Sequence, residues 1–244
     1  QGTEQAGLIA AVGDNGIGLS GVCPHCKIAV LAVFTPFPAP HYSVGEAAFY
    51  ANAMGIEIQN HSYYPYAGYY QNILDALEEA DTLGYLAVMC AGTNQYLRGT
   101  NYIGPPAYYA DLYGFQNTLV VGGSTNADQR DFISNWDVNI VDLFAPCGCY
   151  TTAYNFGAEG YNTYSMTNSS SSLVAGMAGL LKDYVPAASG KQIKKVIMDS
   201  VDQKASLEQF KFLYSYCRYA LYESIFNRFT KTCFDGLRFR QVQP

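Results

Sequence analysis

The chain has 244 residues, of which 49% are hydrophobic and 14% are charged, and its net charge is −6. This length is enough for one domain that buries about three quarters of the surface of the unfolded chain. The negative charge argues against nucleic acid or an anionic membrane as the main partner. The chain contains no run of roughly 18 apolar residues, the length needed to cross a bilayer. We therefore expect a globular chain without a membrane span.

Apolar, β-rich segments alternate with helical patterns up to about residue 200. The expected strands are Ile28–Phe34, Ile56–Asn60, Tyr85–Ala91, Thr118–Gly122 and Ile140–Phe144. The expected helices are Val44–Met54, Gln71–Leu83, Ser171–Tyr184 and Lys191–Asp199. This alternation is typical of a mostly parallel sheet with helices on both faces. The sequence therefore predicts an α/β fold of three layers.

The last part of the chain, residues 201–244, is aromatic and mildly basic, with seven basic against four acidic side chains. Ser206 and Gln209 have the spacing of a capping box, which predicts the start of a helix. An apolar stripe follows at helical spacing: Phe210, Leu213, Tyr214, Cys217, Leu221 and Ile225. Further aromatic residues cover the remaining sides of this helix. Such a helix must be buried, so we expect it to bind a protein partner or to pack on the protein's own core.

Four segments resemble the subtilisin-like serine peptidases and follow one another in that family's order. The first is QGTEQAGLIAAVGDNGIGLSGVCPHCKI, and the second is IQNHSYY with the later YLAVMCAGTN. The third and fourth are PPAYYADLYGFQNTLVVGGSTNADQRDFISNWDVNIVDLFAPCG and YSMTNSSSSLVAGMAGLL. The resemblance covers roughly residues 1–200 and implies a subtilisin-like domain there, followed by residues 201–244 as a helical extension.

The resemblance places neutral side chains at the catalytic positions. The family's histidine aligns with Gln1, its nucleophilic serine with Asn168 and its oxyanion-hole asparagine with Thr93. The segment that would carry the family's catalytic aspartate lies upstream of the first residue. An amide does not titrate near neutral pH, so it cannot take a proton from a nucleophile. We therefore expect a catalytically inactive domain with a structural or protein-binding role in a larger assembly.

A rewired site is the alternative hypothesis. The related sedolisins use a glutamate as the base, and Glu4 is the candidate for that role here. Ser169 would be the nucleophile, but it lies one residue past the family position and about 100° around a helix from it. The favoured interpretation of Glu4 is instead a carboxylate in the first turn of a helix, where its charge interacts favourably with the helix dipole. The alternative function is thus an active serine endopeptidase of the subtilase or sedolisin group.

The segment that resembles the substrate-binding strand is also altered. Its candidate binding residues are Ser62, Tyr63, Tyr64 and Tyr66. Tyr64 stands where the family usually has a small glycine, so a phenol would occupy space that a substrate backbone needs. Tyrosine is favoured at protein interfaces. These side chains form either a contact patch for a partner or a packing surface for the chain's own C-terminal part.

The cysteines offer three interpretations. Cys23-Pro-His-Cys26 and Cys147-Gly-Cys149 have spacings compatible with a zinc site. The resemblance places Cys23 and Cys26 where the family usually has alanine, which favours buried structural thiols, and a local disulfide is the third possibility. We expect no metal.

No cofactor is expected either, because the glycine-rich stretch Val12–Gly21 lacks the Lys-Ser/Thr pair of a phosphate-binding loop. His61, beside the altered strand, is expected to be a polar strand-end residue.

Overall fold

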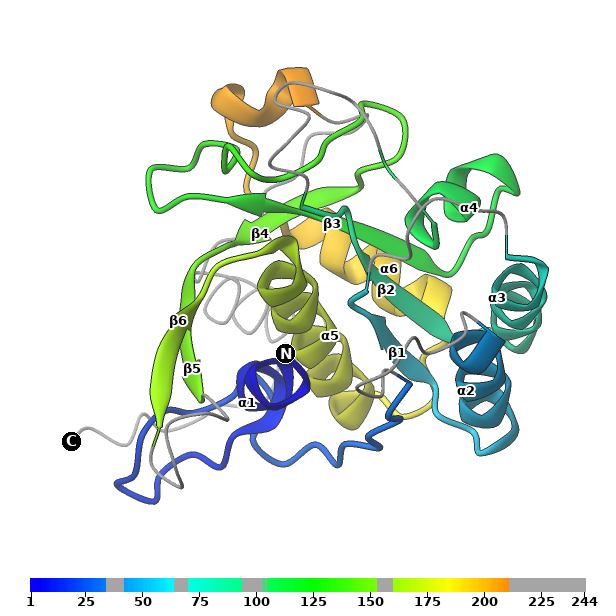
Figure 1. Ribbon diagram of the computed structural model, residues 1–244, viewed down its shortest axis with the longest axis horizontal. Coiled ribbons are helices and arrows are strands. Elements are labelled where there is room, and N and C mark those ends of the chain that lie inside the picture. Colours follow the sequence, from blue (N-terminus) through cyan, green and yellow to red (C-terminus); the bar gives the residue numbers. More distant parts are fainter. Residues whose placement is uncertain (34–41, 64–69, 94–102, 104, 153–159, 211–244) are drawn as a thin grey trace, which may run out of the picture.

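The computed structural model describes the chain except residues 34–41, 64–69, 94–102, 104, 153–159 and 211–244 (Figure 1). Its central sheet consists of four strands that lie side by side in chain order: β1 (Ile58–His61), β2 (Leu86–Cys90), β3 (Thr118–Ser124) and β4 (Leu143–Pro146). All neighbouring strands are parallel. Every residue of β2 and β3 is buried, as expected for a parallel sheet covered on both faces.

Helices cover both faces of this sheet, so the predicted three-layer α/β architecture is confirmed (Figure 1). One layer consists of α5 (Thr167–Tyr184) and α6 (Gly190–Ser200), with α1 (Gly2–Ala10) packed on α5. The opposite layer consists of α2 (Tyr42–Ala53), α3 (Gln71–Leu83) and α4 (Ala107–Leu112). Each layer encloses its own apolar core, one including Val88 and Leu119 and the other Ile73 and Met89.

Local sequence signals explain where two of the helices begin and end. In α3 the buried residues recur at helical spacing, and the helix stops at Gly84, whose φ of 77° is in the left-handed region. The start of α6 is a capping box, in which Ser189 and Gln192 satisfy each other's backbone N–H groups. Both boundaries lie within one residue of the predicted ones.

The first expected strand, Ile28–Phe34, is the main error of the fold prediction. Residues 28–33 form no strand pairing, and Ile28 and Val30 are 40% and 75% exposed. A run of branched apolar residues favours a strand, but a strand also needs a neighbour with which to pair. Among the described residues, β1 is consequently an edge strand with a neighbour on one side only.

A two-stranded antiparallel sheet, β5 (Cys149–Thr152) with β6 (Tyr161–Tyr164), lies beside the main sheet and was not predicted. It is fastened to the first turn of α1, because Thr151 Oγ1 donates to the Glu4 carbonyl at 2.9 Å and Thr152 Oγ1 to the Thr3 carbonyl at 3.0 Å. Gly7 of α1 faces the same two threonines, and a Cβ there would lie 2.4 Å from Thr152 Oγ1. The close approach of α1 therefore requires glycine at this position.

The start of the C-terminal extension is attached to the domain by a 3₁₀ helix at Ala205–Phe210. Leu207 is fully buried in the apolar core that includes Ile73 and Met89, and Lys204 Nζ lies 3.0 Å from the Asp128 carboxylate. The expected aromatic helix beyond this point falls outside the described residues, so it and the domain boundary at residue 200 remain predictions. Within the described ranges, no helix is both long and apolar enough to span a membrane.

Candidate active site

The residue at the expected nucleophile position is held by a structural hydrogen bond. Asn168 lies in the first turn of α5 and is 8% exposed. Its Nδ2 donates to the carbonyl oxygen of Ser62, just past the end of β1, at 2.6 Å. Gln5 Nε2 approaches the same carbonyl at 3.4 Å. The Asn168 amide thus joins α5 to the sheet, and an amide has no nucleophilic hydroxyl or thiol to offer.

Serine hydroxyls continue this contact along α5. Ser62 Oγ lies 2.6 Å from Ser171 Oγ and donates to Asn60 Oδ1 at 2.8 Å, while Asn60 Nδ2 donates to Ser172 Oγ at 3.2 Å. We call these five residues, Asn60, Ser62, Asn168, Ser171 and Ser172, the polar contact. Ser171 and Ser172 are fully buried, and buried polar groups are stabilised when they are hydrogen-bonded.

Thr93 and Ser169 both use their hydroxyls to stabilise the start of α5. Thr93 Oγ1 accepts from the Thr167 backbone N–H at 3.3 Å and lies 3.2 Å from Thr167 Oγ1, so it caps an otherwise free donor of the helix. Ser169 is fully buried, and its Oγ donates to the Met166 carbonyl at 2.7 Å. The structure therefore places both candidate residues beside Asn168, with their hydroxyls engaged in local bonds.

The two candidates for the base lie on α1. Gln1 is the N-cap residue of this helix, its side chain is 65% exposed, and that side chain makes no capping bond. Glu4 is half-buried in the first turn. Both residues are described, and no hydrogen bond joins the Glu4 carboxylate to the Ser169 hydroxyl. The hydrogen bonds therefore do not connect Glu4, as base, to Ser169, as nucleophile, in the way that the rewired site would require.

The one described imidazole close to Ser62 faces the other side of the sheet. Side chains alternate along a strand, so Gln59 and His61 point towards α2 while Asn60 and Ser62 point towards α5. His61 Nε2 donates to Gln59 Oε1 at 3.2 Å, and Nδ1 accepts from the Tyr63 hydroxyl at 2.8 Å. Burial lowers the pKa of His61 to about 4. The ring is therefore neutral at pH 7 and directed away from α5.

The expected binding residues divide into two groups. Ser62 is 7% exposed and its hydroxyl belongs to the polar contact, so it is covered rather than open to a ligand. Tyr63 is half-buried and bonded to His61, and burial raises the pKa of its phenol. Tyr64 and Tyr66 fall outside the described residues. The proposed aromatic patch therefore remains a prediction for these two residues.

Of the three cysteine interpretations, the local disulfide holds for the first pair: Cys23 is bonded to Cys26. Our preference for structural thiols was wrong there. Cys90, Cys147 and Cys149 are free, and burial raises the pKa of Cys90 and Cys149 to about 11 and that of Cys147 to about 12. These three thiols stay protonated and unreactive at neutral pH. Within the described part of the chain, no three potential metal ligands cluster.

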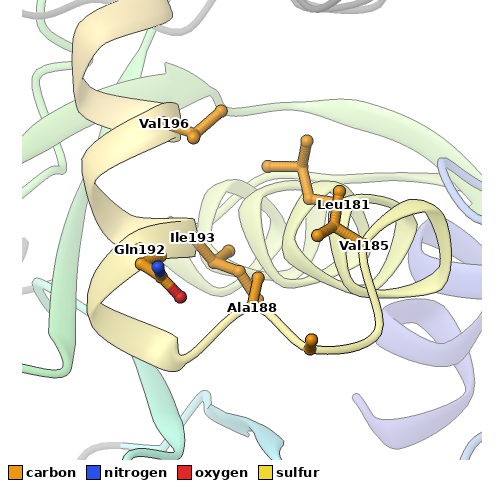
Figure 2. Close-up of a pocket in the computed structure, with 7 residues that line it drawn as sticks. Leu181, Val185, Ala188, Gln192, Ile193 and Val196 are labelled. Atoms are coloured by element: carbon orange, nitrogen blue, oxygen red, sulfur yellow. The ribbon is translucent and has the colours of Figure 1, made fainter. Parts of the chain in front are cut away.

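An apolar cavity of about 260 Å³ lies between the end of α5 and the start of α6 (Figure 2). Its lining residues are Leu181, Val185, Ala187, Ala188, Gln192, Ile193 and Val196. The polar member, Gln192, uses its side-chain oxygen in the α6 capping box. Asn168 lies roughly 20 Å away along α5, given the rise of 1.5 Å per residue. The cavity is therefore separate from the candidate active site and contributes no reactive group to it.

The helices α1 and α5 both begin near the end of β1 in the parallel sheet. This is the arrangement that the resemblance to subtilisin-like peptidases implied. The sequence pattern of the Subtilase family matches residues 2–216. The chain therefore belongs to this family.

Individual relatives agree with this assignment. Alkaline elastase YaB from Bacillus sp. (strain YaB) is 28% identical over 86% of this chain and 52% of its own length. Thermitase from Thermoactinomyces vulgaris is 28% identical over 83% of this chain and 67% of its own length. A solved cold-adapted subtilisin-like serine proteinase superposes with a TM-score of 0.71 at 22% identity, covering 88% of this chain and 72% of that one. The chain spans about half the length of alkaline elastase YaB.

No motif in the sequence indicates the polar contact directly. Ser62 and Asn168 are 106 residues apart in the chain, and their contact depends on how α5 crosses the sheet. One signal was available: the run Ser169–Ser172 directly precedes an apolar helical pattern. Buried hydroxyls at a helix start need backbone or side-chain partners, so this run could have indicated a hydrogen-bonded start of α5.

Proposed function

We propose that this member of the Subtilase family is a catalytically inactive pseudoenzyme that acts as a structural or protein-binding component of a larger assembly. The observation that carries the proposal is the position of Asn168. It stands where the resemblance puts the nucleophile, it is buried, and its amide nitrogen donates to the Ser62 carbonyl at 2.6 Å. Acyl transfer by a serine peptidase requires a hydroxyl at this position together with a base.

The proton acceptor gives independent support. Gln1 carries an amide where the family has its histidine, and an amide cannot act as a general base near neutral pH. His61, on the far face of β1, already uses both ring nitrogens in hydrogen bonds. Loss of the base alone removes several orders of magnitude of rate. Together, the two replaced positions favour a scaffold role over hydrolysis.

A protein-binding role is supported by surfaces that a partner could cover. Among the described residues, β1 has an open edge, and such edges pair readily with an added strand from another polypeptide. Ile28 and Val30 expose apolar surface in the unpaired segment 28–33. The expected aromatic helix of the C-terminal extension would add a larger apolar surface. We propose that the partner is a protein and that this extension is its main contact.

Activity assays on the full chain test the loss of hydrolysis. We expect neither labelling by a fluorophosphonate nor cleavage of general peptidase substrates from acidic to mildly alkaline pH. The matched variants are Ser169→Ala and Glu4→Gln, because these residues define the rewired alternative. Turnover that either variant abolishes would overturn the proposal. Asn168→Ser is expected to stay inactive, since it restores a hydroxyl without a base, and peptide cleavage by this variant would contradict the assignment.

The second candidate function is an active serine endopeptidase of the subtilase or sedolisin group. It is favoured by the relatives, several of which are named as proteases, such as "Alkaline protease" from Alkalihalobacillus alcalophilus. The geometry speaks against it, because the Ser169 hydroxyl is buried and donates to a backbone carbonyl. The same assays separate this candidate from the first.

Light scattering on the full chain tests the assembly role. We expect the native protein to be part of a species larger than a monomer, and we expect Tyr214→Ser with Leu221→Ser, on the predicted apolar stripe, to weaken that association. Lys231→Ser in the same extension is the matched control, because it changes a charge outside the stripe. A stable lone monomer under native conditions would contradict obligate assembly.

A further inference from the structure

The turn Cys23-Pro24-His25-Cys26 follows α1 and has no part in the proposed scaffold role. Its two cysteines form a disulfide whose ends differ in accessibility: Cys23 is 1% exposed, whereas Cys26 is half-buried. The residues on either side of Cys26, His25 and Lys27, are both exposed. We propose that this disulfide is a reversible redox site that exchanges with a small thiol such as glutathione, with Cys26 as the attacked sulfur.

The difference in exposure between the two cysteine residues sets the direction of the exchange. A thiolate can approach the half-buried Cys26, while the protein covers Cys23. The ammonium of Lys27, exposed and next to Cys26 in the chain, favours an incoming thiolate. Exchange rates depend on access and on thiolate character. Cys23 is thus the leaving sulfur, and it remains close enough to re-form the bond.

The turn does not depend on the disulfide for its conformation. The Cys23 backbone N–H donates to the Ile9 carbonyl at 2.8 Å, and the Cys26 N–H donates to the Cys23 carbonyl at 3.0 Å. A disulfide stabilises a fold mainly by closing a long loop, and this bond joins residues only three positions apart. Opening it therefore leaves the turn in place, which is a requirement for a bond that is made and broken in the folded protein.

The packing beneath the turn restricts how the reduced form can be accommodated. The disulfide lies against Gly179 of α5, where a Cβ would be 2.9 Å from Cys26 Sγ and 4.0 Å from Cys23 Sγ. Two unbonded sulfur atoms need more room than a bonded pair. Because α5 blocks movement inwards, the reduced Cys26 side chain must turn outwards to solvent, where a second thiol can reach it.

The reaction is balanced by two molecules of the small thiol. The first thiolate attacks Cys26 Sγ, forming a mixed disulfide, and the Cys23 thiolate leaves and takes up a proton. The second thiolate attacks the small-molecule sulfur of the mixed disulfide, which releases the Cys26 thiolate and forms the oxidised small thiol. The protein disulfide gains two electrons and two protons, and the two thiols supply both.

Trapping experiments on the full chain test the assignment. The background variant is Cys149→Ser, which removes a partly exposed free thiol. In this background, Cys23→Ser should capture glutathione on Cys26. The matched Cys26→Ser variant should capture it at least roughly tenfold more slowly on Cys23, because that sulfur is buried. Mass mapping of peptides locates the adduct. Equal capture by the two variants would overturn the asymmetry on which the proposal depends.

The reversible step is measured on the unaltered chain. Across mixtures of reduced and oxidised glutathione, we expect thiols at Cys23 and Cys26 to appear and disappear together while the far-ultraviolet circular dichroism stays constant. A bond that stays oxidised in every mixture, or that opens only as the protein unfolds, would contradict the proposal. If a single-cysteine variant fails to fold, the position of the mixed disulfide in the unaltered chain decides: an adduct on Cys23 refutes it.

Discussion

The face of β1 that meets α5 and the face that meets α2 both carry buried polar side chains, but they differ in their chemistry. Towards α5, Asn60 and Ser62 contact amides and hydroxyls, none of which titrates in the ordinary pH range. Towards α2, Gln59 and His61 form a network that includes an imidazole. A one-residue step along the strand therefore separates the ionisable group from the helix start at which a family member would need it.

The largest effect is expected from pushing α5 away from the rest of its layer. A Cβ on Gly176 would lie 2.9 Å from Val22 Cβ and 3.4 Å from the Ile9 Cα. Gly176→Leu overpacks this contact, and we expect it to cost about 3 kcal/mol or more and to unfold the domain. Thermal melting followed by circular dichroism measures this. Gly2→Ala, at a position with open space around it, is the control, and an unchanged melting curve for the leucine variant would refute the packing.

Of the two faces of β1, only the one towards α2 carries a group that acidification should affect, His61. The pKa of His61 is about 4 in the folded protein against 6.5 for an ordinary histidine, so the unfolded chain binds the proton more readily. The stability from the neutral ring is complete above pH 6.5 and is lost as the pH falls to 4, by about 3 kcal/mol. Urea unfolding across this pH range measures the loss. His61→Gln should flatten the profile by that amount; an identical profile in this variant would exclude His61 as the cause.

A smaller effect, independent of pH, is expected on the α5 face. Asn168→Ala removes the donor to the Ser62 carbonyl, and we expect a loss of about 1–2 kcal/mol with the fold retained. Denaturant unfolding measures this loss, and the difference from the wild-type protein should be the same at pH 7 and at pH 5. Asn139→Ala, at an exposed position, should change stability by less than about 0.5 kcal/mol. Unfolding of the Asn168→Ala variant would show that the polar contact is indispensable.

The smallest effect should come from the outer end of the α2 network. Glu79 Oε2 accepts from Asn52 Nδ2 at 2.8 Å, and Asn52 in turn contacts Gln59. Glu79→Gln keeps an acceptor at this exposed position, so we expect a change of less than about 0.5 kcal/mol in the free energy of unfolding. Glu78→Gln on the same helix is the matched control. A much larger loss would mean that the Glu79 charge, and not only its oxygen, supports the network.

The sequence predicted the parts of the fold that depend on local pattern. The apolar runs of β2 and β3 were located to within two residues, because strands buried on both faces read as continuous hydrophobic segments. The start of α5 was placed at Ser171 instead of Thr167, since serines favour helix starts and turns over helix interiors. The Ser172 hydroxyl donates to the Asn168 carbonyl one turn back in α5, whereas the Ser170 hydroxyl donates to the carbonyls of Ala145 and Pro146, which only the folded chain brings near.

The candidate site was predictable in its residues but not in its contacts. The resemblance to the family located Gln1, Thr93 and Asn168, because aligning a family motif with the sequence assigns each catalytic position to one residue. The bond from Asn168 to Ser62 and the opposite orientation of His61 depend on the strand's register and its alternation. These are properties of the assembled sheet, and single-sequence patterns do not contain them.

The threonine bonds from β5 to the first turn of α1 determine how this part of the molecule opens. Helix ends normally fray at little cost, because their terminal groups have few partners. Here the carbonyls of Thr3 and Glu4 are anchored by Thr152 and Thr151, so the beginning of α1 cannot unwind unless β5 detaches as well. The helix start and the small sheet therefore form one cooperative unit, and local unfolding must break both together.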